Sequence, residues 1–121
     1  MKDAAGTEHL QKLVLTKERF LTPNVIFEPN SVRLDQGGIT DTLFESIKSM
    51  HPDFYGHAVA NITLCGGNTM FDGFYNKFYD EVRSNTDELC GIGIKHIRNS
   101  NAVLEGMTNF SLGETFTDLA F

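Results

Sequence analysis

The sequence predicts an α/β fold in which a mostly parallel sheet is flanked by helices. Two short segments have strand character: 62–65 is apolar and ends at a glycine pair, and 91–97 alternates with period two. Amphipathic helical patterns stand before, between and after these segments. Strands that alternate with helices imply right-handed crossovers and parallel pairing. At 121 residues, the chain is long enough for one domain with its own core.

The N-terminal third shows weak patterns. Residues 1–11 are polar, so we expect a flexible tail there. Residues 13–16 read LVLT, with branched side chains at Val14 and Thr16, and predict a strand. Prolines interrupt 16–38, so we expect turns or one brief helix, tethered by scattered apolar residues.

The helical patterns are stronger. In 38–50 the apolar residues recur on one face, which predicts a helix that buries Ile39, Leu43, Phe44, Ile47 and Met50. A second short helix is expected in 51–60, ending near Asn61. Residues 71–85 predict another amphipathic helix, whose buried face is formed by Phe71, Phe74, Phe78 and Val82. A last helix is expected in 101–110, and 114–121 is again apolar.

Composition excludes several classes of protein. The chain has 16 acidic and 10 basic residues and a net charge of −6, so direct nucleic-acid binding is not expected. No apolar run approaches the length of a membrane span, and the N-terminus lacks a signal-peptide pattern. Cys65 and Cys90 are far apart and form no CxxC pair or zinc knuckle, which is typical of a reduced intracellular compartment.

The most informative local feature is Gly66–Gly67, which ends the apolar segment 62–65. In open α/β sheets ligands bind at the carboxyl ends of the strands, and residues without Cβ atoms let a ring or phosphate approach the backbone. The alternative is a tight strand-to-helix turn with no ligand. The segment matches neither a P-loop nor a GxGxxG fingerprint.

No catalytic constellation is evident. The sequence lacks a Ser/His/Asp or Cys/His set with its orienting partner, and the four histidines have no metal-ligand spacing. Cys65 lies in an apolar context and is expected to be a buried structural thiol. From the residues alone, the chain is an α/β domain with one candidate ligand edge and no assigned chemistry.

Four blocks in order resemble the actin superfamily. They are ERF-LTPNVIFEPN at 18–30, GGITDTLFESI at 37–47, NITLCGGNTMFDGF at 61–74 and AVLEGM at 102–107, and the resemblance covers about residues 12–120. Within the superfamily, GGNTMFDGF and DEVRS look closer to actin-related proteins than to filament-forming actin. The EVR ending and the acidic residue before Gly106 look most like actin-related protein 6, a nuclear subunit of histone-exchange remodellers.

The resemblance implies an actin-like (ribonuclease H-like) half-domain from the C-terminal part of the family's fold. Residues 12–35 would correspond to a piece of subdomain four, and 36–121 to subdomain three running into the start of the C-terminal region. The family binds ATP with Mg²⁺ in a cleft between two halves. Its glycine turn lies against adenine and ribose, which implies that role for Gly66, Gly67, Asn68, Met70 and Phe71.

Departures from the family pattern are informative. A lysine that actins carry near the nucleotide is replaced at about Ser100, and Leu104 and Met107 stand where the family has Trp and Gly. The phosphate-binding loops and hydrolytic residues belong to the N-terminal half of the family's fold. The expectation is therefore no catalysis, and weak or absent ATP binding by this chain alone.

The implied function is a non-catalytic scaffold subunit of a nuclear chromatin-remodelling or histone-exchange complex. Its expected partners are protein subunits, with apolar surface covered by those partners or by self-association, and its compartment is the nucleus or cytoplasm. The alternative is a divergent cytoskeletal actin or actin-like ATPase that forms filaments at full length. A metabolite kinase of the wider ATPase superfamily is disfavoured, because sugar kinases lack the ERF and GITDTLFESI blocks.

Overall fold

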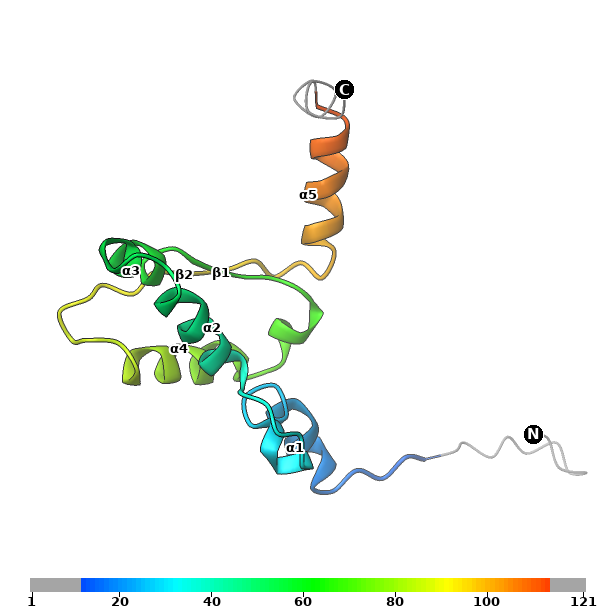
Figure 1. Ribbon diagram of the computed structural model, residues 1–121. Coiled ribbons are helices and arrows are strands. Elements are labelled where there is room, and N and C mark those ends of the chain that lie inside the picture. Colours follow the sequence, from blue (N-terminus) through cyan, green and yellow to red (C-terminus); the bar gives the residue numbers. More distant parts are fainter. Residues whose placement is uncertain (1–11, 114–121) are drawn as a thin grey trace, which may run out of the picture.

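The computed structural model describes residues 12–113 (Figure 1). In chain order the helices and strands are α1 (Glu18–Asn24), η1 (Pro29–Val32), α2 (Ile39–Lys48), η2 (Pro52–Phe54), α3 (Tyr55–Val59), β1 (Ile62–Leu64), η3 (Gly67–Met70), α4 (Phe74–Ser84), β2 (Ile94–His96) and α5 (Ala102–Ser111), where η marks a 3-10 helix. The expected helices in 38–50, 51–60, 71–85 and 101–110 and the strands in 62–65 and 91–97 are all confirmed. Their bounds are shorter than expected, except that α5 keeps its expected length and is shifted by one residue.

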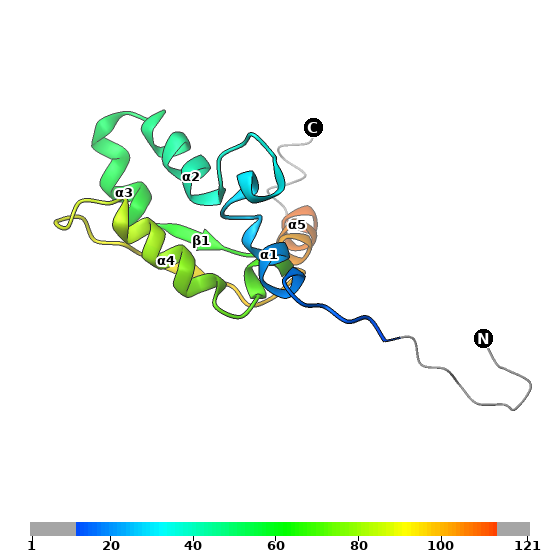
Figure 2. The same cartoon turned by 90° about the horizontal axis from the view of Figure 1, so that it is seen from below.

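β1 and β2 pair in parallel, as the alternation of strands and helices predicted. Ile62 lies opposite Ile94, and Leu64 lies opposite His96. α4 is part of the crossover between the two strands, and Figures 1 and 2 together show α2 and α4 on the same side of them. Thr63 and Lys95, on the opposite face of the strands, are exposed. One face of this sheet is therefore covered by helices and the other is open.

The core is largely aromatic. Its buried members are Phe27, Phe44, Ile62, Leu64, Phe74, Phe78 and Val82. The ring of Phe74 lies 5.0 Å from that of Phe27 and 6.2 Å from that of Phe78, measured between centroids. Since α4 contributes three of these side chains at helical spacing, its apolar face is the surface on which the strands and the N-terminal segment pack.

A polar cluster joins α4 to the segments on either side. The Lys77 ammonium donates to Asn24 Oδ1 at 2.6 Å and lies 3.5 Å from Glu28 Oε1. Glu81, one turn further along α4, accepts from the hydroxyl of Thr40, which is buried in α2. Lys77 also lies 5.0 Å above the Phe27 ring centroid. These contacts fix how α1 and α2 sit on α4.

Two expectations about the elements are wrong. Residues 13–16 form no strand, and Leu13 and Val14 are 84% and 78% exposed, because no strand in the described part of the chain offers them a hydrogen-bonding edge. Phe71 is not part of the buried face of α4. The helix begins only at Phe74, after Gly73 with a φ of +80°, and Phe71 is 47% exposed.

Other expectations have mixed outcomes. Met50 lies beyond the end of α2 and is 44% exposed, whereas Phe44 and Ile47 are buried as predicted. The expected tail at 1–11 and the apolar segment 114–121 lie outside the described residues.

α5 projects from the end of the sheet (Figure 1), and none of its residues is buried. Its exposed apolar side chains include Val103, Leu104 and Met107. No helix within 12–113 is both long and apolar enough to cross a membrane.

We predict that Gly93→Ala destabilises the fold. A Cβ atom on Gly93 would lie 2.1 Å from the carbonyl oxygen of Ala60, so the backbone that leads into the paired strands must shift. We expect a loss of about 1–3 kcal/mol in the free energy of unfolding, measured with urea. Gly56→Ala is the matched control because a Cβ there meets no atom within 4 Å, and we expect a gain of about 0.4–1 kcal/mol. Equal effects of the two substitutions would contradict the close approach at Gly93.

Candidate functional site

The candidate site is the turn that follows β1, residues 65–71. Gly66 has φ +98° and ψ 158°, a conformation that is essentially restricted to glycine. The 3-10 helix η3 starts at the next residue, and Phe71 already has extended backbone angles. The strand can turn this sharply because Gly66 carries no Cβ.

Thr69 holds the turn from inside. Its side chain is buried, and its hydroxyl donates to the carbonyl oxygen of Gly66 at 2.8 Å. The backbone N–H of Thr69 donates to the same oxygen at 3.1 Å. His96 Nε2 lies 3.2 Å from the Thr69 hydroxyl oxygen. Because the single hydroxyl proton points to Gly66, Nε2 of His96 is the donor in this arrangement.

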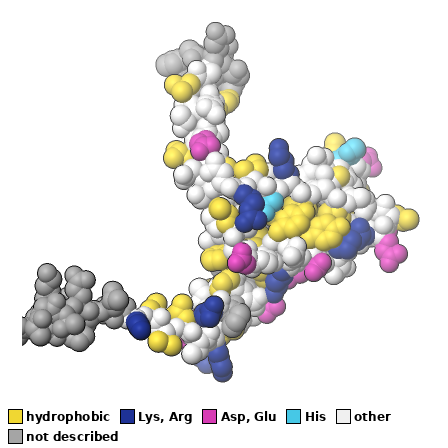
Figure 3. Space-filling view, turned by 180° about the vertical axis from the view of Figure 1, so that it is seen from behind, with side chains coloured by type: hydrophobic (Ala, Val, Ile, Leu, Met, Phe, Trp, Pro, Cys, Tyr) yellow, Lys and Arg dark blue, Asp and Glu magenta, His cyan; other side chains and the backbone are white. Residues whose placement is uncertain are grey.

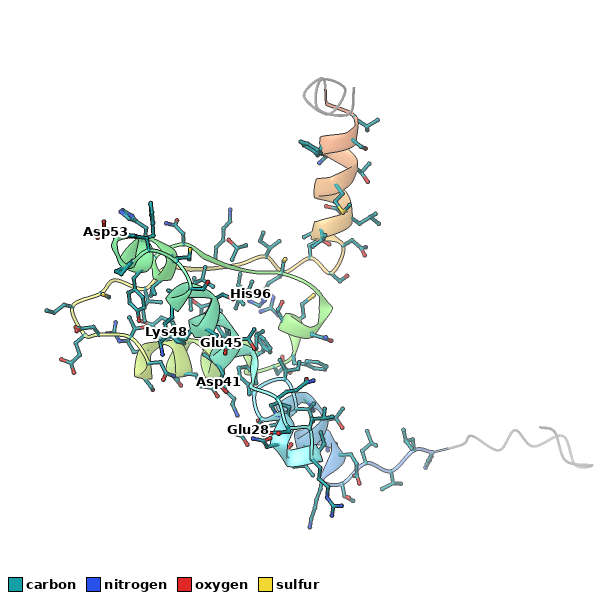
Figure 4. The ribbon with its side chains drawn as sticks, in the orientation of Figure 1. Glu28, Asp41, Glu45, Lys48, Asp53 and His96 are labelled. Carbon is teal, nitrogen blue, oxygen red and sulfur yellow. The ribbon has the colours of Figure 1, made fainter. Side chains whose placement is uncertain are left out.

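His96 connects the turn to the rest of the fold. It is the last residue of β2, lies opposite Leu64 in the sheet, and stacks on Tyr75 of α4 with a centroid distance of 5.8 Å and an interplanar angle of 12°. Figure 4 shows His96 on the side of the strands that faces α4. Sequence reasoning missed both Thr69 and His96. The spacing of Thr69 three residues after Gly66 is the signal of a side-chain-stabilised turn.

The outer side of the turn is open. A Cβ built on Gly66 meets no atom within 4 Å, and one built on Gly67 meets only Cβ of Ser100, at 3.9 Å. Asn68 is exposed, as are Met70 and Phe71 at 37% and 47%. The five residues implied by the resemblance therefore form one continuous turn with accessible apolar side chains and free space beside its glycines. Ser100 lies next to Gly67 in this turn.

Phe71 borders two pockets. One, of about 320 Å³, is lined by Phe71, Asp72, Gly73, Tyr75, Asn76, His96 and Arg98. The other, of about 150 Å³, reaches from Phe71 to Lys77 and the end of α1. The ring of Phe71 thus borders both the larger pocket and the smaller pocket over the core.

The chemistry near the turn is limited. Within residues 12–113, no group of three or more His, Cys, Asp or Glu side chains is placed to hold a metal ion. Cys65 is exposed, so the expectation of a buried thiol is wrong. The inward positions of β1 are Ile62 and Leu64, and Cys65 lies beyond the strand's end. In the described part of the chain, the turn itself offers backbone space and apolar contact.

We predict that Thr69→Val loosens this turn. Valine keeps the shape of threonine but loses the hydroxyl that joins Gly66 to His96, so we expect a loss of about 1–3 kcal/mol in the free energy of unfolding. Thr63→Val, on the exposed face of β1, is the matched control and should stay within about 0.5 kcal/mol of the parent. Chemical denaturation measures both, and a harmless Thr69→Val would show that the hydroxyl does not hold the turn.

Comparison with known proteins places the chain in a family. The family model described as Actin matches residues 8–119. Actin-like protein arp6 of Aspergillus fumigatus is 31% identical over 87 residues, which cover 69% of this chain and 18% of that protein. Actin-related protein 6 of Dictyostelium discoideum is 31% identical over 84 residues, 69% of this chain and 17% of the relative. Actin-related protein 7 of Oryza sativa subsp. indica is 28% identical over 80 residues, 66% of this chain and 22% of the relative.

The chain therefore spans about a fifth of the length of these relatives, which are matched over 18%, 17% and 22% of their residues. The family model extends over nearly all of the chain, including the glycine turn and both strands. The α/β architecture with its parallel strand pair agrees with this assignment. The chain belongs to the actin family, and its similarity is to the actin-related proteins.

Proposed function

We propose that this chain is the C-terminal part of an actin-related protein that serves as a non-catalytic scaffold subunit in a nuclear chromatin-remodelling or histone-exchange assembly. The observation that carries the proposal is the similarity to proteins named actin-related protein 6 or actin-like protein arp6 in several organisms. Together with the resemblance to a nuclear subunit of histone-exchange remodellers, this favours a scaffold over a filament subunit.

The turn at 66–71 would form the adenine side of a nucleotide cleft. The actin family generally binds ATP with Mg²⁺, and the open space beside Gly66 and Gly67 suits the close approach of a flat ring. Asn68, Met70 and Phe71 are accessible on the same turn and would flank the adenine and ribose. Bound nucleotide would supply a rigid link between the two halves of the family's fold.

Only one wall of that cleft is present in this chain. The residues that would contact phosphates and Mg²⁺ belong, by the resemblance, to the N-terminal half of the family's fold. In this arrangement 12–35 would correspond to a piece of subdomain four, and 36–121 to subdomain three running into the start of the C-terminal region. A single wall leaves most of the ligand in water, so nucleotide binding by the isolated chain would be weak.

The exposed apolar surface supports a role in an assembly. Val103, Leu104 and Met107 on α5 are 58%, 65% and 67% exposed, more than a monomeric domain usually leaves uncovered on one helix. A protein partner, or a second copy of the chain, would cover this surface. The net charge of −6 argues against direct contact with nucleic acid.

The proposed function is tested in nuclei. We expect the tagged full-length product of the gene to be enriched in nuclear extract and to co-purify with subunits of a histone-exchange remodeller, identified by mass spectrometry. Sedimentation of the same product in polymerising salt is the complementary measurement. Filament pelleting without any remodeller subunit would contradict the scaffold role and favour the cytoskeletal alternative.

We also predict how the isolated chain responds to ATP. Micromolar ATP with Mg²⁺ should not raise its melting temperature, because one wall cannot enclose the nucleotide. Ser100→Lys places an ammonium beside Gly67, since a Cβ built on Gly67 would lie 3.9 Å from Cβ of Ser100, and should strengthen the weak binding expected at millimolar ATP by a few-fold.

Asn101→Lys adds the same charge one residue further along and serves as the control for this substitution. Saturable stabilisation of the parent chain at micromolar ATP would contradict the one-wall arrangement. Equal gains from the two lysines would show that net charge, not position beside the turn, sets the affinity.

A further inference from the structure

α4 and β2 together carry a row of three stacked rings. His96 stacks on Tyr75 at 5.8 Å and 12°, and Tyr75 stacks on Tyr79 at 6.4 Å and 23°. The two tyrosines are four residues apart, so they lie on one face of α4. Both remain more than a third exposed, at 36% and 38%. This row is separate from the buried face of Phe74, Phe78 and Val82 on the same helix.

An arginine stands at each end of the row. Arg98 follows His96 at the next same-face position along the chain and shares the pocket of about 320 Å³ with it. Arg83 lies one turn beyond Tyr79 on α4, where its guanidinium donates to the carbonyl oxygens of Cys90 at 3.1 Å and Asp87 at 2.6 Å. Within residues 12–113, neither arginine forms an ion pair with a carboxylate. Neutral carbonyl oxygens, that of Thr86 among them, hold the guanidinium of Arg83 in place, but no carboxylate in the described part of the chain neutralises either positive charge.

Figure 3 shows this side of the molecule. Hydrophobic side chains form a band across its centre, a histidine adjoins the band, and basic side chains stand at both of its ends. A row of rings between two positive charges is unusual on a chain with a net charge of −6. The pocket at the Arg98 end is also bordered by the ring of Phe71 and by the amide of Asn76, which can donate hydrogen bonds to a carboxylate.

We propose that this row, Arg98–His96–Tyr75–Tyr79–Arg83, docks an extended acidic segment of a partner protein. One carboxylate of the segment binds Arg98 in the pocket, the apolar or aromatic side chains that follow lie on the rings, and a second carboxylate binds Arg83. Charge complementarity identifies the occupant, because within residues 12–113 the guanidinium group at each end of the row lacks a carboxylate partner. The proposal rests on the scaffold function proposed above, because that function makes the partner a protein.

Single-stranded nucleic acid is the other ligand that stacks on aromatic rows. It needs a positively charged groove that follows the phosphate backbone. Here the two arginines are separated by the whole row, and Asp72 adds a carboxylate to the pocket wall. An acidic peptide with spaced carboxylates fits this pattern of charge better.

The test is a selection of random peptides on the immobilised 121-residue chain, followed by fluorescence-anisotropy titration of the enriched sequences. We expect enrichment of peptides in which Asp or Glu flank aromatic or aliphatic residues. Arg98→Glu should weaken their binding about tenfold. Lys95→Glu is the matched control, since it makes the same change of charge at an exposed position on the opposite face of β2, and it should leave affinity nearly unchanged.

A second variant moves affinity in the other direction. Asp72→Asn removes the carboxylate from the pocket wall and should strengthen binding of the same peptides by a few-fold, an effect that a merely structural role of the loop would not produce.

Tyr79→Ser, which shortens the row without touching the core, should weaken binding, with the unfolding curve measured in parallel to confirm that the variant is folded.

Several results would overturn the proposal. One is enrichment of peptides without acidic residues, and another is an equal loss of binding in Arg98→Glu and Lys95→Glu. A third is that oligothymidylate, as a single-stranded nucleic acid in the same anisotropy titration, binds more tightly than every enriched peptide. The outcome is independent of the nuclear co-purification. Acidic peptides that bind through Arg98 while no remodeller subunit co-purifies would contradict the scaffold assignment and leave the docking row intact.

Discussion

The parallel pairing of β1 with β2 is the constraint on which the rest of the structure depends. Parallel strands cannot be joined by a tight turn, so the chain must cross over the sheet before it can pair again. That crossover contains α4, whose buried face is Phe74, Phe78 and Val82. The same pairing puts the end of β2 next to the end of β1. His96, which follows Thr69 by 27 positions, therefore helps to hold the glycine turn. Its Nε2 lies 3.2 Å from the hydroxyl oxygen of Thr69.

The regular elements were largely predictable because local pattern and tertiary packing agree in them. The helical spacing of Phe74, Phe78 and Val82 describes a surface that is in fact buried. The alternation in 91–97 places Ile92 and Ile94 on the face that packs, partly buried, against the core. The strand predicted for 13–16 does not form, because a strand needs a neighbouring strand to pair with and sequence propensity alone does not supply one. Phe71 does not join the buried face predicted for this helix, because Gly73, in a left-handed conformation, delays the start of the helix to Phe74.

The candidate site was predictable in part for a different reason. The glycine pair and its position after a strand identified the turn, and the resemblance to actin identified its neighbours. Thr69 and His96 escaped notice because their contact joins residues 27 positions apart in the chain. The docking row escaped notice as well. The sequence pattern assigns no role to Tyr75 or Tyr79, and only the fold brings His96 beside Tyr75.

Phe71 lies where the two proposed roles meet. It ends the turn that would contact adenine, and it also borders the pocket at the Arg98 end of the docking row. Thr69 and His96 connect the same two regions through hydrogen bonding and stacking. One small set of contacts thus underlies both the proposed nucleotide-facing wall and the proposed docking row.

The central claim is that residues 66–71 form a nucleotide-facing wall. It is tested most directly by titrating the isotopically labelled chain with millimolar ATP and Mg²⁺ and following the backbone amide resonances. The account predicts graded shifts confined to Gly66, Gly67, Asn68, Met70 and Phe71 and to Ser100 beside them. Shifts clustered elsewhere, for example around the pocket between α2 and Asn85, or no shift in the turn at any concentration, would contradict it.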